Sequence, residues 1–317
     1  MKKIKILLTF LCIMAGIGIM ANSGSAYLLQ EGDNTLFFKN FETVFDSAGN
    51  ELNFDTATPP TLQIGDHFVG IIDVQEITVG GTSTWFKSGT EQLTGLFAQR
   101  IEAIYAPNKD PYDANNSLTH IVLGAPTVST FNPLGGGSFT TGLTGDESMA
   151  LYYDTGATLF ESNGSIVNDV AKATDGSLWM TLGYNNSGTD DISDDDGYNY
   201  SHTAQLGTTV NNFTGENWAA LNVYRNLFGE LLTGDMNDPN ENEIDNIIAG
   251  LLTDVYLSGE FEGNPDWLAE TRTSPWVFAS NDPAHIGIIP EPTTIFLFGS
   301  GLLCLAGFAR RKTRNLS

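Results

Sequence analysis

Alternation of hydrophobic and polar residues dominates the middle of the chain and predicts β-strands. The clearest run covers residues 67–79, where the phase of the alternation slips at Gln75-Glu76. This slip predicts either a bulge within one strand or a turn between two strands. Gly80-Gly81 follows directly and supplies the next turn. Further short strands are predicted at residues 119–123, 148–153, 178–182, 255–261 and 276–279.

Residues 93–105 fit two periodicities at once. Their apolar residues recur at helical spacing, yet Ile101, Ala103 and Tyr105 alternate with polar neighbours as in a strand. Because Thr94-Gly95 lies inside the run and disfavours a helix, we interpret the segment as a strand.

Three segments predict helices. Residues 238–252 show the strongest pattern, since Asp238 can cap the N-terminus, Pro239 suits the first turn and an apolar stripe follows. Residues 165–173 predict a short helix with one apolar face, and residues 218–232 predict another.

Short strands separated by turns, with few helices and no regular strand–helix alternation, are typical of a mainly β protein. We therefore expect a β-sandwich or jelly-roll-like ectodomain at residues 27–289, with one to three short helices. Its last residues, 281–289, are expected to form only a short tether.

Residues 1–26 have the pattern of a secretory signal peptide. A lysine-rich start precedes an apolar run, and Gly24-Ser25-Ala26 supplies the small residues of a cleavage site. We expect cleavage between Ala26 and Tyr27, after export through the secretion translocon.

A second apolar run, at residues 293–309, predicts a C-terminal transmembrane helix. Between Glu291 and Arg310 lie 18 residues without a charge, which as a helix would span roughly 27 Å, close to the hydrocarbon thickness of a bilayer. The basic tail, residues 310–317, follows at once and predicts that this end stays in the cytoplasm. Everything before Pro290 is then expected on the outer side.

The triplet Pro290-Glu291-Pro292, the apolar span and the basic cluster Arg310-Arg311-Lys312 follow one another at this end of the chain. Their order and spacing resemble the PEP-CTERM sorting signal of Gram-negative bacteria, here covering residues 290–317. The resemblance implies that an exosortase-type membrane protease recognises the signal and cuts near the triplet. It also implies a transient stay in the inner membrane with the ectodomain in the periplasm. Release or transfer to the cell surface would follow, often in bacteria that make exopolysaccharide.

Charge is distributed very unevenly along the chain. Residues 27–289 hold 7 Lys+Arg and 37 Asp+Glu, a net charge of −30, whereas the whole chain carries −24. Such a charge excludes nucleic acid as a natural partner, because phosphate binding needs cations. It favours contact with divalent cations or neutral polysaccharide. Cys12 and Cys304 lie in the apolar ends, so no disulfide is expected in the ectodomain.

Five aspartates lie within seven residues: Asp190, Asp191, Asp194, Asp195 and Asp196. Carboxylates this close repel one another unless a cation bridges them, and calcium accepts many oxygen ligands. The cluster is therefore a candidate calcium site, although its spacing differs from that of an EF-hand. A solvated acidic loop without a bound ion is the alternative interpretation.

Tyr198 and Tyr200 share one face if the stretch around them is a strand. Aromatic side chains beside an acidic loop can stack on sugar rings, which makes both residues candidate glycan contacts. A packed aromatic ladder is the alternative interpretation.

Motifs of catalysis are missing from the sequence. It contains neither a His-Glu-x-x-His zinc motif nor a Gly-x-Ser-x-Gly nucleophile motif. We expect a non-enzymatic surface or extracellular-matrix protein that interacts with exopolysaccharide or calcium. The alternatives are a lectin-like carbohydrate-binding module and a secreted hydrolase such as a glycosidase, which needs only two well-placed carboxylates.

Overall fold

The structure is a computed structural model. It describes residues 28–30, 32–54, 60–106, 108–109, 119–126, 147–156, 159–162, 165–183, 199–205, 214–227, 255–263 and 274–288. These residues form the strands and helix β1 (Gly32–Phe45), β2 (His67–Val79), β3 (Thr82–Phe86), β4 (Glu91–Tyr105), β5 (Thr119–Gly124), β6 (Glu147–Thr155), α2 (Ile166–Ala173), β7 (Ser177–Gly183), β8 (Asn199–Gln205), β9 (Thr214–Asn226), β10 (Val255–Gly263) and β11 (Phe278–Ile288).

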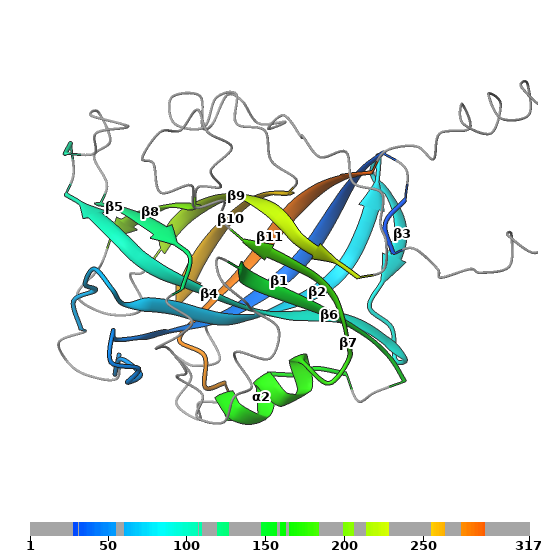
Figure 1. Cartoon of the computed structure of the whole chain (residues 1–317), viewed down its shortest axis with the longest axis horizontal. Coiled ribbons are helices and arrows are strands. Elements are labelled where there is room, and N and C mark those ends of the chain that lie inside the picture. Colours follow the sequence, from blue (N-terminus) through cyan, green and yellow to red (C-terminus); the bar gives the residue numbers. More distant parts are fainter. Residues whose placement is uncertain are drawn as a thin grey trace, which may run out of the picture.

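The strands of the described residues belong to one antiparallel sheet that closes on itself (Figure 1). Their order is β3-β2-β1-β11-β10-β9-β7-β6-β4-β5-β8, and the further pairings β2–β4 and β8–β9 complete the ring. The long strands β4 and β9 pair with β6 and β7 over one half of their length, and with β5 and β8 over the other.

The expectation of a mainly β fold is confirmed, but the expected arrangement in two facing sheets is corrected to a single closed sheet. The physical reason is the pairing of β2 with β4 and of β8 with β9, which gives hydrogen-bond partners to strands that would otherwise form sheet edges. Local alternation predicts a strand but says nothing about which distant strand it pairs with.

A β-bulge at Gln75 resolves the phase slip in β2. Phe37 of β1 pairs with Glu76 and Phe38 pairs with Val74, so Gln75 has no partner residue in β1. The first alternative, one bulged strand, is therefore confirmed. Gly80 and Gly81 follow with φ of 55° and 78°, a pair of left-handed residues that suits the two-residue turn to β3.

The other predicted elements divide into confirmed and corrected ones. Residues 93–105 are a strand as predicted, and α2 begins after Ser165, whose side chain accepts from the Asn168 amide. Residues 218–232 were expected to be helical, yet β9 runs through Thr214–Asn226, because its pairing with β10 and β8 overrides local spacing.

The expected tether at residues 281–289 is also corrected, because β11 continues to Ile288 between β1 and β10. Pro283 lies inside this strand, although proline lacks an N–H and is uncommon within a sheet. The expected helices at 238–252 and 293–309 lie outside the described residues. Among the residues that are described, no helix has the length and apolarity needed to cross a membrane.

Apolar side chains fill most of the inner face of the ring. One cluster includes Phe38 and Leu93, and a second, toward the other end, includes Phe68 and Ile101. A third cluster lies on the outer face, where α2 and Trp276 cover parts of β1, β2, β4 and β6. The remaining outer face of β1, β2 and β3 is not under this cover and carries exposed aromatic side chains.

Candidate functional site

Two exposed phenylalanines lie in one row across β1, β2 and β3. Phe37 is opposite Glu76 on the neighbouring strand, and Glu76 is in turn opposite Phe86. Phe37 is 44% exposed and Phe86 is 66% exposed. Because neighbouring strands are about 4.8 Å apart, the two phenylalanines are separated by about 10 Å, with Glu76 between them.

The bulge at Gln75 brings the carboxylate into this row. If the same residues alternated regularly after Asp73, with no bulge, Glu76 would face inward and Ile77 would face solvent. With the bulge, Ile77 pairs with Leu36 and is fully buried, while Glu76 is partly exposed beside Phe37.

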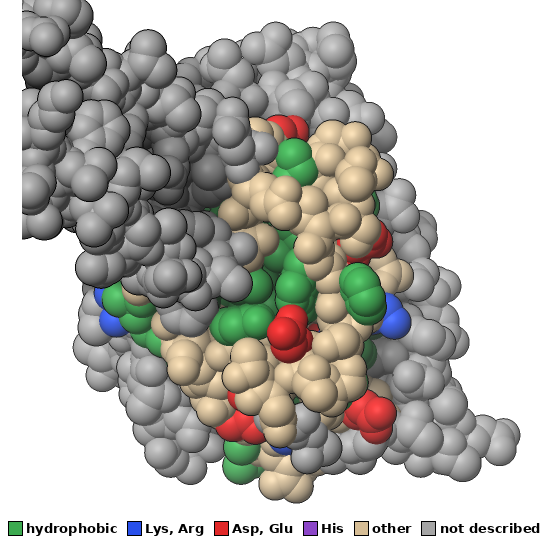
Figure 2. All heavy atoms as spheres, turned by 90° about the vertical axis from the view of Figure 1, so that its right-hand side faces the viewer, with side chains coloured by type: hydrophobic (Ala, Val, Ile, Leu, Met, Phe, Trp, Pro, Cys, Tyr) green, Lys and Arg blue, Asp and Glu red, His purple; other side chains and the backbone are tan. Residues whose placement is uncertain are grey.

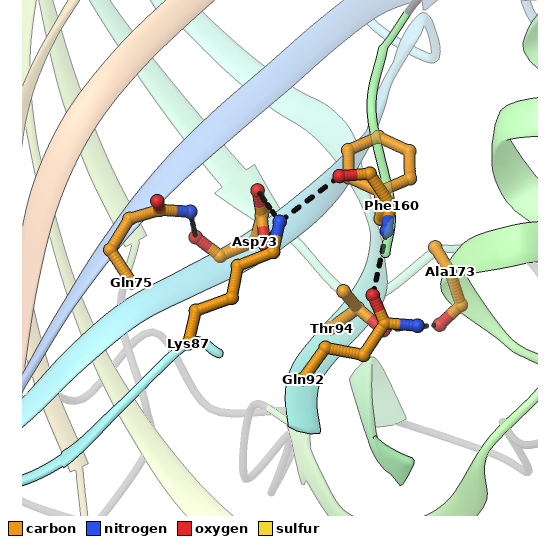
Figure 3. Close-up of polar contacts among 7 residues, drawn as sticks. All are labelled: Asp73, Gln75, Lys87, Gln92, Thr94, Phe160 and Ala173. Atoms are coloured by element: carbon orange, nitrogen blue, oxygen red, sulfur yellow. Dashed lines mark hydrogen bonds and ion pairs between the residues drawn. The ribbon is translucent and has the colours of Figure 1, made fainter. Parts of the chain in front are cut away.

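Phe86 is held outward by contacts of the residues on both sides of it. Trp85 packs against the inner cluster and donates its indole N–H to Glu91 Oε2 at 3.2 Å. Lys87 Nζ lies 2.8 Å from both carboxylate oxygens of Asp73 and donates to the Phe160 carbonyl at 3.0 Å (Figure 3). The end of β3 is therefore anchored by the neighbours of Phe86.

The same network fastens the outer cover to the sheet (Figure 3). Gln92 Oε1 accepts from the Phe160 amide at 2.7 Å, and Thr94 Oγ1 donates to the Ala173 carbonyl at 2.9 Å. Burial raises the pKa of Asp73, and the positive charge of Lys87 opposes this effect. The geometry indicates a structural anchor, because both charged groups are already paired.

The side of the molecule on which β3 lies shows hydrophobic and acidic side chains together (Figure 2). Lysine and arginine lie only toward the margins of the described surface in this view. A surface of this kind can stack on flat apolar faces and accept hydrogen bonds.

A second polar group of residues lies on the inner face, between the two apolar clusters. Asp282 Oδ2 accepts from Asn40 Nδ2 at 2.7 Å and from Ser280 Oγ at 2.6 Å. Glu42, the next inward-facing residue of β1 after Asn40, is 6% exposed. Burial and the nearby charge of Asp282 raise the pKa of Glu42 to about 8.

The sites predicted from sequence lie mostly outside the described residues. This holds for the five aspartates between 190 and 196, for Tyr198, for Ala26 and Tyr27, and for the triplet and basic cluster of the sorting signal. Tyr200 lies on β8, where its backbone pairs with Val122 and Trp218. Across the part of the chain that the structure describes, no three His, Cys, Asp or Glu side chains gather as a metal-ligand group.

Sequence reasoning missed both the outer row and the inner polar group. Alternation in β1 was a usable signal, since Leu36, Phe38 and Asn40 share one face and leave Phe37 on the other. The pattern does not tell which face is inside, because both faces carry aromatic and polar residues.

Comparison with known proteins finds a match at the C-terminal end of the chain. Residues 289–312 match the family model of the PEP-CTERM protein-sorting motif. No curated protein and no solved structure matches the chain.

The fold and the motif together define an exported, mainly β protein with a C-terminal sorting signal. More particularly, the chain carries a PEP-CTERM motif, and signals of this kind are substrates of exosortases. The resemblance noted from Pro290-Glu291-Pro292 and Arg310-Arg311-Lys312 is thereby confirmed.

Proposed function

We propose that this protein is a cell-surface or extracellular-matrix component that binds neutral exopolysaccharide through Phe37, Glu76 and Phe86. The sorting motif at residues 289–312 supports delivery, with cleavage by an exosortase after transient anchoring in the inner membrane. The row of two exposed aromatic rings around a carboxylate is the observation that carries the choice of ligand.

Sugar rings present apolar C–H faces that stack on aromatic side chains. The backbone separation of about 10 Å between Phe37 and Phe86, two strand spacings, is close to the length of two successive sugars in an extended chain. Glu76 lies between the rings, where its carboxylate can accept hydrogen bonds from sugar hydroxyls.

Charge favours a neutral polymer over an acidic one. Residues 27–289 carry a net charge of −30, so a polyanion approaching this domain is repelled. A row on an outer sheet face also favours binding over catalysis, since active sites are usually concave and exclude water. We therefore propose a non-enzymatic role.

Binding is tested by co-sedimentation of the secreted protein with microcrystalline cellulose, a neutral extended glucan, and with insoluble cross-linked polygalacturonate as the acidic comparison. Phe37→Ala and Phe86→Ala should each weaken cellulose binding about 3- to 10-fold, because each removes one stacked ring. Ile64→Ala is the matched control, since Ile64 is 65% exposed but outside the row.

Unchanged binding in both phenylalanine variants, or equal binding of the acidic polymer, would contradict the proposed ligand. The delivery step has a separate test, in which Pro290 and Pro292 are both replaced by alanine. The intact mass of the protein recovered from cells should then include the C-terminal segment, whereas the mass of the wild-type protein should lack it.

A further inference from the structure

The inner polar group places four oxygen-bearing side chains along two paired strands. Asn40 of β1 is opposite Ser280 of β11, Asp282 is one inward-facing position away on β11, and Glu42 is one away on β1 in the other direction. The four residues are between 3% and 6% exposed. They lie between the two apolar clusters of the inner face, and burying polar groups there carries a cost unless they are satisfied.

The donors within this group are all directed to one oxygen. Asn40 Nδ2 and Ser280 Oγ both donate to Asp282 Oδ2, at 2.7 and 2.6 Å. Asn40 Oδ1 is buried and accepts from no described group. The carboxyl oxygens of Glu42 likewise have no hydrogen bond among the described residues. Asn40 Oδ1 and the carboxyl group of Glu42 are thus neighbouring acceptors on the inner face of β1.

The orientation of Asn40 is determined by its partner. The Asp282 carboxylate can only accept, so the amide nitrogen must face it. Asp282 is opposite Phe38, on one side of Asn40 along β1, and Glu42 lies on the other side. The amide oxygen is therefore left on the side of Glu42, within the group and not toward bulk water.

We propose that Glu42, Asn40, Ser280 and Asp282 form a binding site for one divalent cation, with calcium as the preferred ion. Two carboxylates offset its charge, and Asn40 Oδ1 and Ser280 Oγ supply neutral oxygen ligands. An all-oxygen set without histidine or cysteine favours calcium over zinc, and the flexible coordination of calcium suits ligands on two different strands better than the strict octahedron of magnesium.

Gly259 contributes space for the site. A Cβ at Gly259 would collide with Asp282 Oδ1, so the side chain of Asp282 lies directly over the glycine of the neighbouring strand β10. This contact limits the rotation of Asp282 and keeps its second oxygen in a fixed position. The carboxylate is thereby held in place before any ion binds, which lowers the ordering cost of binding.

The test uses the full chain, refolded from denaturant so that the ion can reach the interior, either with EDTA or with 5 mM calcium chloride. Calcium should raise Tm by several degrees beyond sodium chloride of equal ionic strength. Equilibrium dialysis should give one calcium per chain that disappears in Glu42→Gln and in Asp282→Asn. The matched control is Glu102→Gln, which removes a carboxylate from a partly exposed ion pair.

The aspartate cluster at residues 190–196 must be separated from the inner site. A variant with Asp194, Asp195 and Asp196 replaced by asparagine should keep the Tm shift and the bound calcium. A shift lost in that variant but kept in both Glu42→Gln and Asp282→Asn would overturn the proposal. So would a Tm of the wild-type protein that calcium leaves unchanged. A further outcome is that Glu42→Gln raises Tm in EDTA while the wild-type protein binds no calcium. Glu42 would then be protonated and would donate to Asn40 Oδ1, so a proton and not an ion satisfies the site. This outcome would also overturn the proposal.

Discussion

Trp276 donates its indole N–H to Asp169 Oδ2 at 2.9 Å, and both side chains are completely buried. The bond links the segment before β11 to helix α2, which covers the outer face of the sheet. It joins residues 107 positions apart and adds a second attachment of the cover besides the network of Lys87 and Asp73.

Replacing Trp276 by phenylalanine should lower the free energy of unfolding by about 1 to 3 kcal/mol, because the ring is largely kept while a buried carboxylate loses a donor. Urea unfolding followed by circular dichroism measures this change. Val167→Ala on the exposed face of α2 is the control and should change stability by no more than about 0.5 kcal/mol. Equal effects of the two substitutions would argue against the bond as the source.

Lys87→Met should destabilise the protein by about 3 to 5 kcal/mol, because it leaves Asp73 buried without its cation. The double variant with Asp73→Asn should regain part of this loss, and chemical denaturation of the single and double variants measures the coupling. Glu102→Gln, in the more exposed pair with Arg100, should cost less than about 1 kcal/mol. A purely additive double variant would contradict the pairing.

Gly70→Ala should destabilise by about 1 to 3 kcal/mol through overpacking. A Cβ at Gly70 would lie 2.5 Å from ring atoms of Phe97 and from the Phe41 carbonyl oxygen. At Gly89 a Cβ meets nothing within 4 Å, so Gly89→Ala serves as the control with little effect. Thermal unfolding of the two variants under one condition distinguishes them, and equal Tm values would refute the packing argument.

His67 should make the protein less stable in acid. Burial and the positive charge of Arg100 lower the pKa of His67 from 6.5 to about 4. The unfolded chain therefore binds a proton before the folded one does, so this contribution is present above pH 6.5 and is lost as the pH falls toward 4. The difference in unfolding free energy between the wild type and His67→Gln should shrink over this window. A difference that stays constant with pH would contradict the prediction.

Glu42 should act in the opposite direction when no ion is present. Its pKa is raised from 4.5 to about 8, so its contribution is complete below pH 4.5 and is lost as the pH rises through 8. In EDTA, the wild-type protein should lose stability relative to Glu42→Gln between these two pH values. Urea titrations at pH 5, 7 and 9 measure the trend, and a wild-type protein that gains relative stability with rising pH would disprove it.

Several local features were predictable because they depend on neighbours within a few residues. The slip at Gln75-Glu76 indicated the bulge, and the apolar face of residues 165–173 indicated α2. The sorting motif was readable for the same reason, since triplet, span and basic cluster are contiguous. The segments misread were β9 and the end of β11, in which tertiary pairing overrides local preference.

Sequence alone determined the strand-rich character of the chain, its acidity and its sorting signal. Only the tertiary structure decided that the sheet closes, which face of β1 is inside, and that Asn40 meets Asp282 across 242 positions. The physical reason is that a strand exposes the same hydrogen-bonding groups to any partner. Burial of the whole inner face determines the register of each strand and which strands are its neighbours. This information is spread over the whole chain, so no short stretch of sequence contains it.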